Sequence, residues 1–163
     1  MKPITQVTPS RLDELVEAAK TNARRRSNLN LHETLDDPIQ RLAIAMQPDT
    51  LIRPHRHRHT WELLLPLRGR FVVILFDESG VVSERIALGD SVSLVELPAG
   101  QWHAVLSLDS GAVIFEVKHG PYIPTEPADF APWLAEDTVC ADPQRVLAAY
   151  AAARVGARLP DCR

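Results

Sequence analysis

The sequence has 163 residues, of which 45% are hydrophobic and 24% are charged, and its formal net charge is −3. These values are typical of a soluble globular domain and exclude an intrinsically disordered chain. The net negative charge excludes a general attraction to nucleic acid or anionic lipid, and no apolar run is long enough to cross a bilayer. We therefore expect a single domain over residues 1–163, without a nucleic-acid or membrane partner.

The predicted elements begin with a helical N-terminal segment over about residues 10–25. Its apolar residues follow the i, i+3, i+4, i+7 spacing of a buried helical stripe, and they are Leu12, Leu15, Val16 and Ala19. Ser10 is the expected N-cap. Three consecutive arginines, residues 24–26, follow. We interpret them as a solvated helix end, with contact to an anion as the alternative.

Short extended segments rich in Val, Ile, Leu and Phe follow over about residues 28–119. We expect strands at 28–32, 40–47, 50–57, 61–67, 70–76, 81–88, 91–98, 102–108 and 112–118. Turn sequences separate many of them, such as "DESG" at 77–80 and "PAG" at 98–100. Many short strands without intervening helices predict a sandwich or barrel.

The chain changes character after these strands. Four prolines between residues 120 and 138 exclude a regular helix or strand there, so we expect an ordered flap or a loose linker. A C-terminal helix is predicted over about residues 142–157, with Asp142 before it and Pro143 at its first position. The predicted architecture is therefore all-β, with one helix at each end.

Three histidines alternate in the stretch "PHRHRHTWE" at residues 54–62. In an extended chain, residues two apart lie on the same face, so His55 and His57 would direct their rings together. Two imidazoles directed at one point suggest a metal site. Because arginines alternate through the same run, a solvated basic edge strand is the alternative.

The spacing of these histidines resembles the motifs of the cupin superfamily. The chain reads His55, one residue, His57, four residues, Glu62, six residues and Gly69, and "PAGQWH" later brings His103. The resemblance implies a cupin jelly-roll β-barrel or sandwich in which the metal ligands are His55, His57, Glu62 and His103. Three imidazoles and one carboxylate suit a divalent transition metal such as Fe, Mn, Zn or Ni. His59 is then a turn residue or lies behind the ligands.

A longer order of segments is similar to the WbuC-type cupin metalloproteins, named after O-antigen polysaccharide gene clusters. It runs from "RRRSNLNLHETLDDPIQRLAIAMQPDTLIRPHRHRHTWE" through "FDESG" and "LPAGQWH" to "FEVKHGPY", over roughly residues 24–137. This resemblance implies a divalent metal and a link to surface-polysaccharide or nucleotide-sugar metabolism. It implies no particular reaction, because the fold alone does not define one.

Further polar residues are candidates for the site. Glu116 and Lys118 share one face of a strand and lie either inside the barrel or toward solvent. If they face inward, Glu116 is a candidate base, and Lys118 is a candidate to bind a carboxylate or phosphate of the substrate. Tyr122 would reach the barrel mouth from the flap. The candidate substrate-binding residues are Arg53, Arg41, Asn30 and His32.

Three functions are compatible with these residues. The first is a metal-dependent isomerase, epimerase or lyase acting on a small polar or sugar-derived substrate. The second is an Fe(II)-dependent oxygenase of a small organic acid, and the third is a non-catalytic module that binds a small molecule. We also expect a homodimer that pairs through the "NLNLH" strand. A cytoplasmic location is expected because Cys140 and Cys162 need not be bridged in a domain of this size.

Overall fold

The structure is a computed structural model that describes residues 4–134 and 142–159. Both cysteines lie outside the described residues. The elements in chain order are α1 (Pro9–Thr21), β1 (Arg26–Asn30), β2 (Ile39–Met46), β3 (Glu62–Arg68), β4 (Phe71–Phe76), β5 (Val82–Leu88), β6 (Val95–Leu97), β7 (Trp102–Ser107), β8 (Ala112–His119), the short 3-10 turns η1 (Pro127–Asp129) and η2 (Pro132–Leu134), and α2 (Pro143–Ala152).

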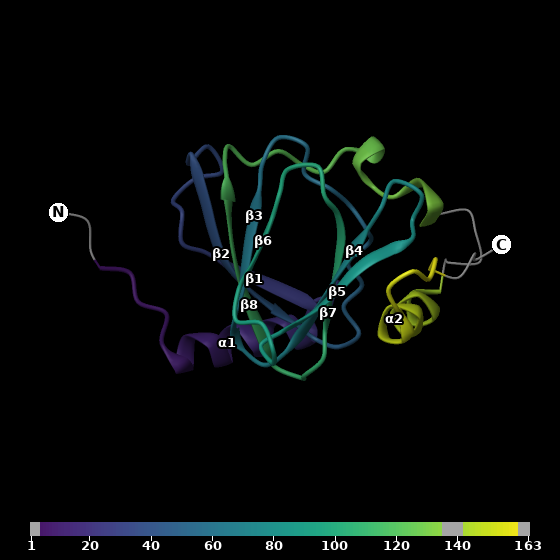
Figure 1. The fold of residues 1–163 in the computed structure, drawn as a ribbon. Helices are drawn as coiled ribbons and strands as arrows, with labels where there is room; N and C mark the ends of the chain where they lie inside the picture. Colours follow the sequence, from purple (N-terminus) through teal and green to yellow (C-terminus); the bar gives the residue numbers. More distant parts are fainter. Residues whose placement is uncertain (1–3, 135–141, 160–163) are drawn as a thin grey trace.

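Two antiparallel sheets face one another and enclose the barrel interior (Figure 1). The larger sheet has the order β1-β2-β8-β3-β6, and the smaller has the order β5-β4-β7. All the strand pairs are antiparallel, and β3 passes to β4 through Gly69, which has a φ of 73°. This region of left-handed backbone favours glycine, and a Cβ there would lie 2.8 Å from Cβ of Ala112. The predicted all-β jelly-roll sandwich with two helices is confirmed.

Alternation along the strands divides the apolar residues between the interior and the outer faces. In β4, Phe71, Val73 and Leu75 belong to the cluster inside the barrel, whereas the residues between them belong to the cluster under α2. In β8, Val113 and Phe115 pack with α1. Both faces of each sheet are thus covered where these clusters lie, and for that reason β4 is buried along its whole length.

The two helices cover different sheets (Figure 1). Helix α1 contacts β1, β2 and β8 through the predicted apolar stripe, whereas α2 packs on the outer face of the smaller sheet. The predicted cap of α1 is wrong: the oxygen of Thr8, not Ser10, accepts from the backbone N–H of Arg11, because Pro9 already occupies the first helical turn. Asp142 caps α2 as predicted. No helix in the described part of the chain has the length and hydropathy needed to span a bilayer.

Several segments differ from the expected elements. Of the strand expected at 91–98, only β6 forms, and α1 ends at Thr21 instead of near residue 25. Residues 50–57 do not form a regular strand, and His55 alone makes isolated bridges, to His103 and Phe130. Pro54 interrupts this run, since proline has no N–H to donate to a ladder. The described part of the flap is ordered, and Trp133 packs against the cluster under α2. Helix α2 ends at Ala152, earlier than the expected residue 157.

Candidate metal centre

Three histidines meet at one end of the barrel interior. One ring nitrogen from each of three histidines, His55, His57 and His103, lies within 4.8 Å of the other two nitrogens. The ring centroids of His55 and His103 are 4.5 Å apart, and those of His55 and His57 are 5.0 Å apart. His59 lies in the following turn and is exposed.

Backbone bonds place these rings together although they come from distant parts of the chain. His55 and His103 exchange two backbone hydrogen bonds, of 3.0 and 2.9 Å, so their side chains leave neighbouring strands side by side. The carbonyl of His57 accepts from the N–H of Gly100, which fixes the "PAG" turn against the same segment. The alternation of an extended backbone therefore persists at His55 and His57, although this segment belongs to no regular strand.

The hydrogen bonds of the rings leave nitrogens suited to a metal. Nδ1 of His55 donates to the carbonyl of Arg53 at 2.9 Å, and Nδ1 of His103 donates to the carbonyl of Gln101 at 3.0 Å. Because a carbonyl only accepts, these bonds put a proton on Nδ1, and in the neutral ring Nε2 carries a lone pair. Such carbonyl partners are typical of histidines that ligate metals.

The carboxylate of Glu62 lies against this histidine cluster. One of its oxygens is 3.0 Å from Nε2 of His103, and the other is 3.5 Å from Nε2 of His57 and from Nζ of Lys118. Burial alone would raise the pKa of Glu62, but its close contacts with the imidazoles of His103 and His57 outweigh burial and hold the pKa well below its usual value. The carboxylate is therefore charged.

The same contacts change the protonation of the histidines. Burial, followed by the neighbouring charge of His103, lowers the pKa of His55 to about 3. His103 responds in the opposite direction: burial lowers its pKa, but the hydrogen bond and charge of Glu62 raise it more. A positive charge is thus favoured between Glu62 and the imidazoles, and either a proton on His103 or a bound cation supplies it. The residues fit a divalent transition metal.

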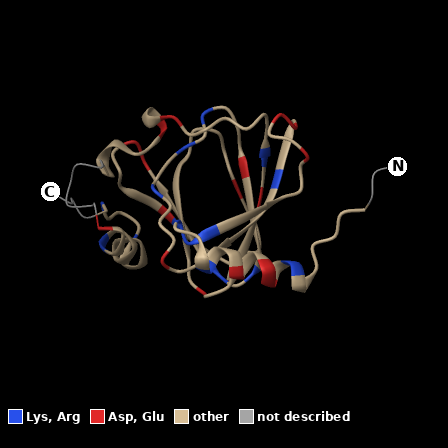
Figure 2. Ribbon diagram, turned by 180° about the vertical axis from the view of Figure 1, so that it is seen from behind, with Lys and Arg blue, Asp and Glu red and all other residues tan. Residues whose placement is uncertain are grey.

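A second buried pair faces the same space. Glu116 and Lys118 lie on the inner face of β8, with Nζ of Lys118 2.7 Å from a carboxylate oxygen of Glu116. Burial and the charge of Glu62 raise the pKa of Glu116. Burial opposes the charge of Lys118, but the two carboxylates outweigh it and raise its pKa. Figure 2 shows charges of both signs along the barrel strands as well as on α1.

These groups line a cavity of about 570 Å³, a volume typical of small-molecule sites. The structure places most of the expected site residues on its wall. Besides the histidines, Glu62, Glu116 and Lys118, these are Asn30, His32, Arg53 and Tyr122. Tyr122 is 48% exposed. Arg41 is not among the described residues that line the cavity. It follows the cavity-lining Gln40 in β2, and its guanidinium pairs with Asp37 at 3.2 Å.

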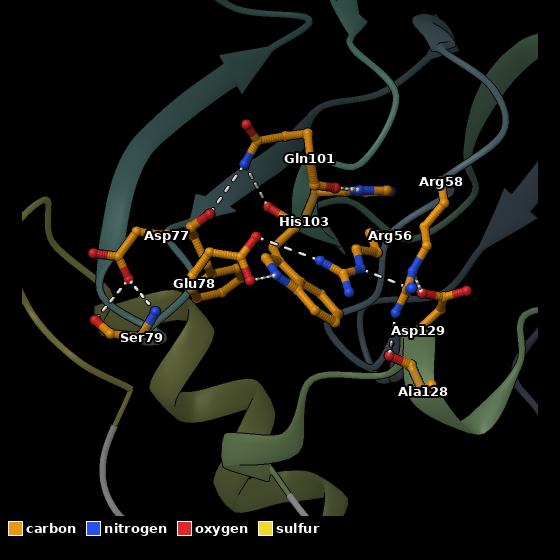
Figure 3. A network of polar contacts seen from close by, with 11 residues as sticks. Arg56, Arg58, Asp77, Glu78, Ser79, Gln101, His103, Ala128 and Asp129 are labelled. Atoms are coloured by element: carbon orange, nitrogen blue, oxygen red, sulfur yellow. Dashed lines mark hydrogen bonds and ion pairs between the residues drawn. The ribbon is translucent and has the colours of Figure 1, made fainter.

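The sequence reasoning missed a polar network that holds the flap beside the histidines (Figure 3). Arg56 lies between Glu78 and Asp129, at 3.4 and 3.2 Å, and its guanidinium stacks 4.3 Å from the ring centre of Trp102. Arg58 also pairs with Asp129. Because Arg56 lies between the two histidines in sequence, this network fixes the segment that carries them. The alternation of arginine and histidine was the only signal of it in the sequence.

The fold is similar to that of solved structures with low sequence identity. CapF, the capsular polysaccharide assembling protein from Staphylococcus aureus, matches with a TM-score of 0.51 and 21% identity, over 66% of this chain and 31% of CapF. An oxalate oxidase in complex with the substrate analogue glycolate matches with a TM-score of 0.51 and 14% identity, over 72% of this chain and 62% of that chain. This chain therefore spans less than two thirds of either protein.

At such identities these likenesses show the fold alone, which is the cupin β-sandwich. No protein with curated annotation matches the sequence. A family model, described as "Domain of unknown function (DUF6016)", matches residues 7–88, just over half of the sequence. The chain is therefore a cupin-fold protein that belongs to the DUF6016 family.

Proposed function

We propose that this protein is a metal-dependent enzyme that acts on a small polar, sugar-derived substrate. His55, His57, His103 and Glu62 would hold iron, manganese, zinc or nickel. The observation that carries the proposal is the buried Glu116–Lys118 pair, which faces the cavity that also contains the three imidazoles. A metal site alone would serve structure or binding, whereas a proton-transfer pair beside it supports a reaction.

The chain's own residues would divide the chemistry between them. A bound divalent cation supplies Lewis-acid polarisation of a substrate oxygen. Glu116 acts as the base, because its raised pKa brings it closer to neutral pH and so makes it a better proton acceptor. Lys118 holds its positive charge between Glu116 and Glu62, and so stabilises a negative charge that forms on the substrate beside it. Isomerisation, epimerisation and elimination all need a base and a positive charge that stabilises the negative charge formed on the substrate.

The substrate class rests on the cavity and on two resemblances. The cavity volume suits a small molecule, and its lining mixes charged, amide and apolar side chains. The sequence resembles WbuC-type cupins, and CapF is named for capsular polysaccharide assembly. We therefore place the substrate in surface-polysaccharide or nucleotide-sugar metabolism. The homodimer and the cytoplasmic location stay predictions.

The test separates the metal from the reaction. The purified protein is analysed for metals, reloaded with each of the four, and incubated with keto acids and nucleotide sugars while NMR follows the substrates. We expect turnover with at least one metal. Glu116→Gln should remove turnover while keeping the metal, and the control Glu84→Gln, at an exposed position of β5, should leave both unchanged.

The alternatives give different results. Oxygen uptake that requires iron and an organic acid would identify the protein as an oxygenase instead of an isomerase, epimerase or lyase. Stoichiometric metal and tight ligand binding without turnover of any compound would make the protein a binding module. Full turnover by the Glu116→Gln variant would contradict the assigned base.

A further inference from the structure

One wall of the cavity, built by β1 and the residues beside it, is rich in hydrogen-bond donors and lies apart from the histidine cluster. Ser27 and five larger polar residues of this stretch line the cavity, and the five are Arg24, Arg26, Asn28, Asn30 and His32. Leu29, on the other face of β1, packs with α1. We call these five cavity-lining residues the β1 wall.

The two arginines at one end of the β1 wall are held by a fixed turn. Between them, Arg25 has a φ of 57°, the only positive φ of a non-glycine residue in the described chain. This costly conformation is held by neighbours: the carbonyl of Arg25 accepts from the fully buried Thr50 hydroxyl and from the N–H of Gln47. The side chain of Arg25 itself pairs with Asp49 at 2.8 Å. The backbone between Arg24 and Arg26 is therefore built by tertiary contacts.

The charges of Arg24 and Arg26 are not neutralised by any described carboxylate at ion-pair distance. The guanidinium of Arg26 donates only to the carbonyl of Leu51, at 3.3 Å. Burial and the charge of Arg24 lower the pKa of Arg26, and the charge of Glu116 opposes them without outweighing them. The described lining contains only two carboxylates, those of Glu62 and Glu116, and Lys118 already contacts both.

At the other end of the β1 wall, His32 presents an unpaired donor. Its residue is only 6% exposed, and Nδ1 accepts from the backbone N–H of Arg41 at 2.9 Å. Nδ1 is also 3.1 Å from the carbonyl oxygen of Arg41, but that oxygen already accepts from the N–H of Leu31, whereas the N–H of Arg41 can only donate. We therefore assign the proton of the neutral ring to Nε2. Nε2 is buried without a hydrogen-bond partner in the described structure. A buried donor without a partner is costly, and an acceptor on a ligand removes that cost.

The amides between these ends add further donors. The side-chain N–H of Asn28 donates to the oxygen of Asn30 at 2.6 Å, so the amide nitrogen of Asn30 keeps its own hydrogens for another acceptor. Two guanidiniums, an amide and an imidazole N–H thus face one space. Because Arg24 and Arg26 lie at one end of this extended stretch and His32 at the other, one group cannot contact all of these donors. The two guanidiniums suit a group with two negative charges and several acceptor oxygens, such as a phosphate monoester.

We propose that the β1 wall contains a phosphate subsite, in which Arg24 and Arg26 bind the phosphate group of the cavity's ligand, while Asn30 and His32 donate to polar groups elsewhere on that ligand. The strand register supports the reach of such a ligand. Asn30 pairs with Leu42, and Leu42 pairs with Glu116. Glu116 is thus two strands, about 10 Å, from Asn30, and Arg26 lies four residues, about 13 Å, from Asn30 along β1. A ligand that reaches both the arginines and Glu116 therefore extends along the wall.

This inference rests on the proposed function only for the cavity that both share, and its test needs neither metal nor turnover. Inorganic phosphate is titrated into the full-length, metal-free protein by calorimetry at low salt, with acetate as the singly charged comparison. We expect phosphate to bind more tightly than acetate. Arg24→Ala and Arg26→Gln should each weaken phosphate binding by about tenfold or more. The control Arg85→Ala, at an exposed position of β5, should change it by less than about twofold.

Arg24 is exposed, so its variant keeps the fold even if Arg26→Gln does not. No phosphate binding, equal affinity in Arg24→Ala and wild type, or tighter binding of acetate than of phosphate would each overturn the subsite. A protein that binds phosphate through Arg24 but never binds a metal would retain the subsite and lose the proposed function. Metal binding and turnover without phosphate binding would retain the proposed function and overturn the phosphate subsite.

Discussion

The interior of the barrel has two halves that differ in character, although the same strands build both. In β3, Glu62 at the start of the strand faces the histidine cluster, and Leu64 two residues later is in the apolar cluster. His103 and Val105 of β7 show the same change. In β8, which runs antiparallel to β3, the polar residues come last. Position along the strand therefore decides which half a residue joins.

The apolar and polar halves of the interior contribute differently to stability and to chemistry. The apolar half, with Phe71, Val73 and Leu88 fully buried, excludes water and stabilises the fold. The polar half buries Glu62, Glu116 and Lys118 in close contact, and such desolvated charges contribute little or cost stability. We therefore expect substitutions in the apolar half to affect unfolding, and those in the polar half to affect metal, pH response and ligand.

The largest effect is expected from Phe71→Ala in the apolar half. Phe71 is 0% exposed, so removing its ring leaves a cavity and should lower the free energy of unfolding by about 3–5 kcal/mol. Denaturant titration measures this change, and Leu94→Ala, at a position 48% exposed, is the control. The metal content of folded protein should stay unchanged. A decrease of less than about 1 kcal/mol in the free energy of unfolding would contradict the idea that the apolar half stabilises the fold more than the polar half.

In the polar half, Lys118→Met should destabilise the metal-free protein by about 3 kcal/mol, because it removes the ammonium that lies 2.7 Å from the buried carboxylate of Glu116. Glu116→Gln should cost less than about 1 kcal/mol, since Lys118 keeps Glu62 as its partner. Adding Glu116→Gln to Lys118→Met should recover part of the loss. Strictly additive effects in this double-mutant cycle would show that the pair is not coupled.

Metal should stabilise only a protein with an intact histidine cluster. At a free concentration 100 times the dissociation constant, a metal that binds only the folded state adds about 2.7 kcal/mol. Melting curves with and without chelator should therefore differ for wild type and for His59→Ala, but coincide for His103→Ala. Elemental analysis should find about one metal per chain in the first two proteins. If His59→Ala lost metal as fully as His103→Ala, the chosen histidines would be wrong.

The smallest expected effect is a pH dependence of the metal-free protein. The pKa of His55 is about 3 in the folded state and about 6.5 in the unfolded chain, so the unfolded chain binds more protons below pH 6.5. Its contribution is thus present above pH 6.5 and lost as the pH falls toward 3. Between pH 7 and pH 5, wild type should lose about 2 kcal/mol more stability than His55→Gln. Parallel stability curves for the two proteins would contradict a buried, neutral His55.

Much of the architecture was predictable because it depends on local patterns. The apolar stripe of α1 and the capping of α2 by Asp142 follow from residue spacing and cap chemistry. The cap of α1 was missed because Thr8 and Ser10 have similar hydroxyls, and the choice depended on Pro9. The expected strand at 50–57 failed because its backbone groups bond mainly to the flap and to His103 instead of a neighbouring long strand.

The sequence carries the residue types and spacings that predict the barrel, the two helices and the alternation of His55 and His57, because side-chain alternation is a local property of an extended chain. It left open which face of β8 is inside, since alternation treats the two faces alike. The tertiary structure decided that, by packing α1 against Val113 and Phe115 so that Glu116 and Lys118 face the cavity. Packing between distant segments also brought the arginines of the β1 wall to the same cavity as His103, a relation that sequence spacing does not contain.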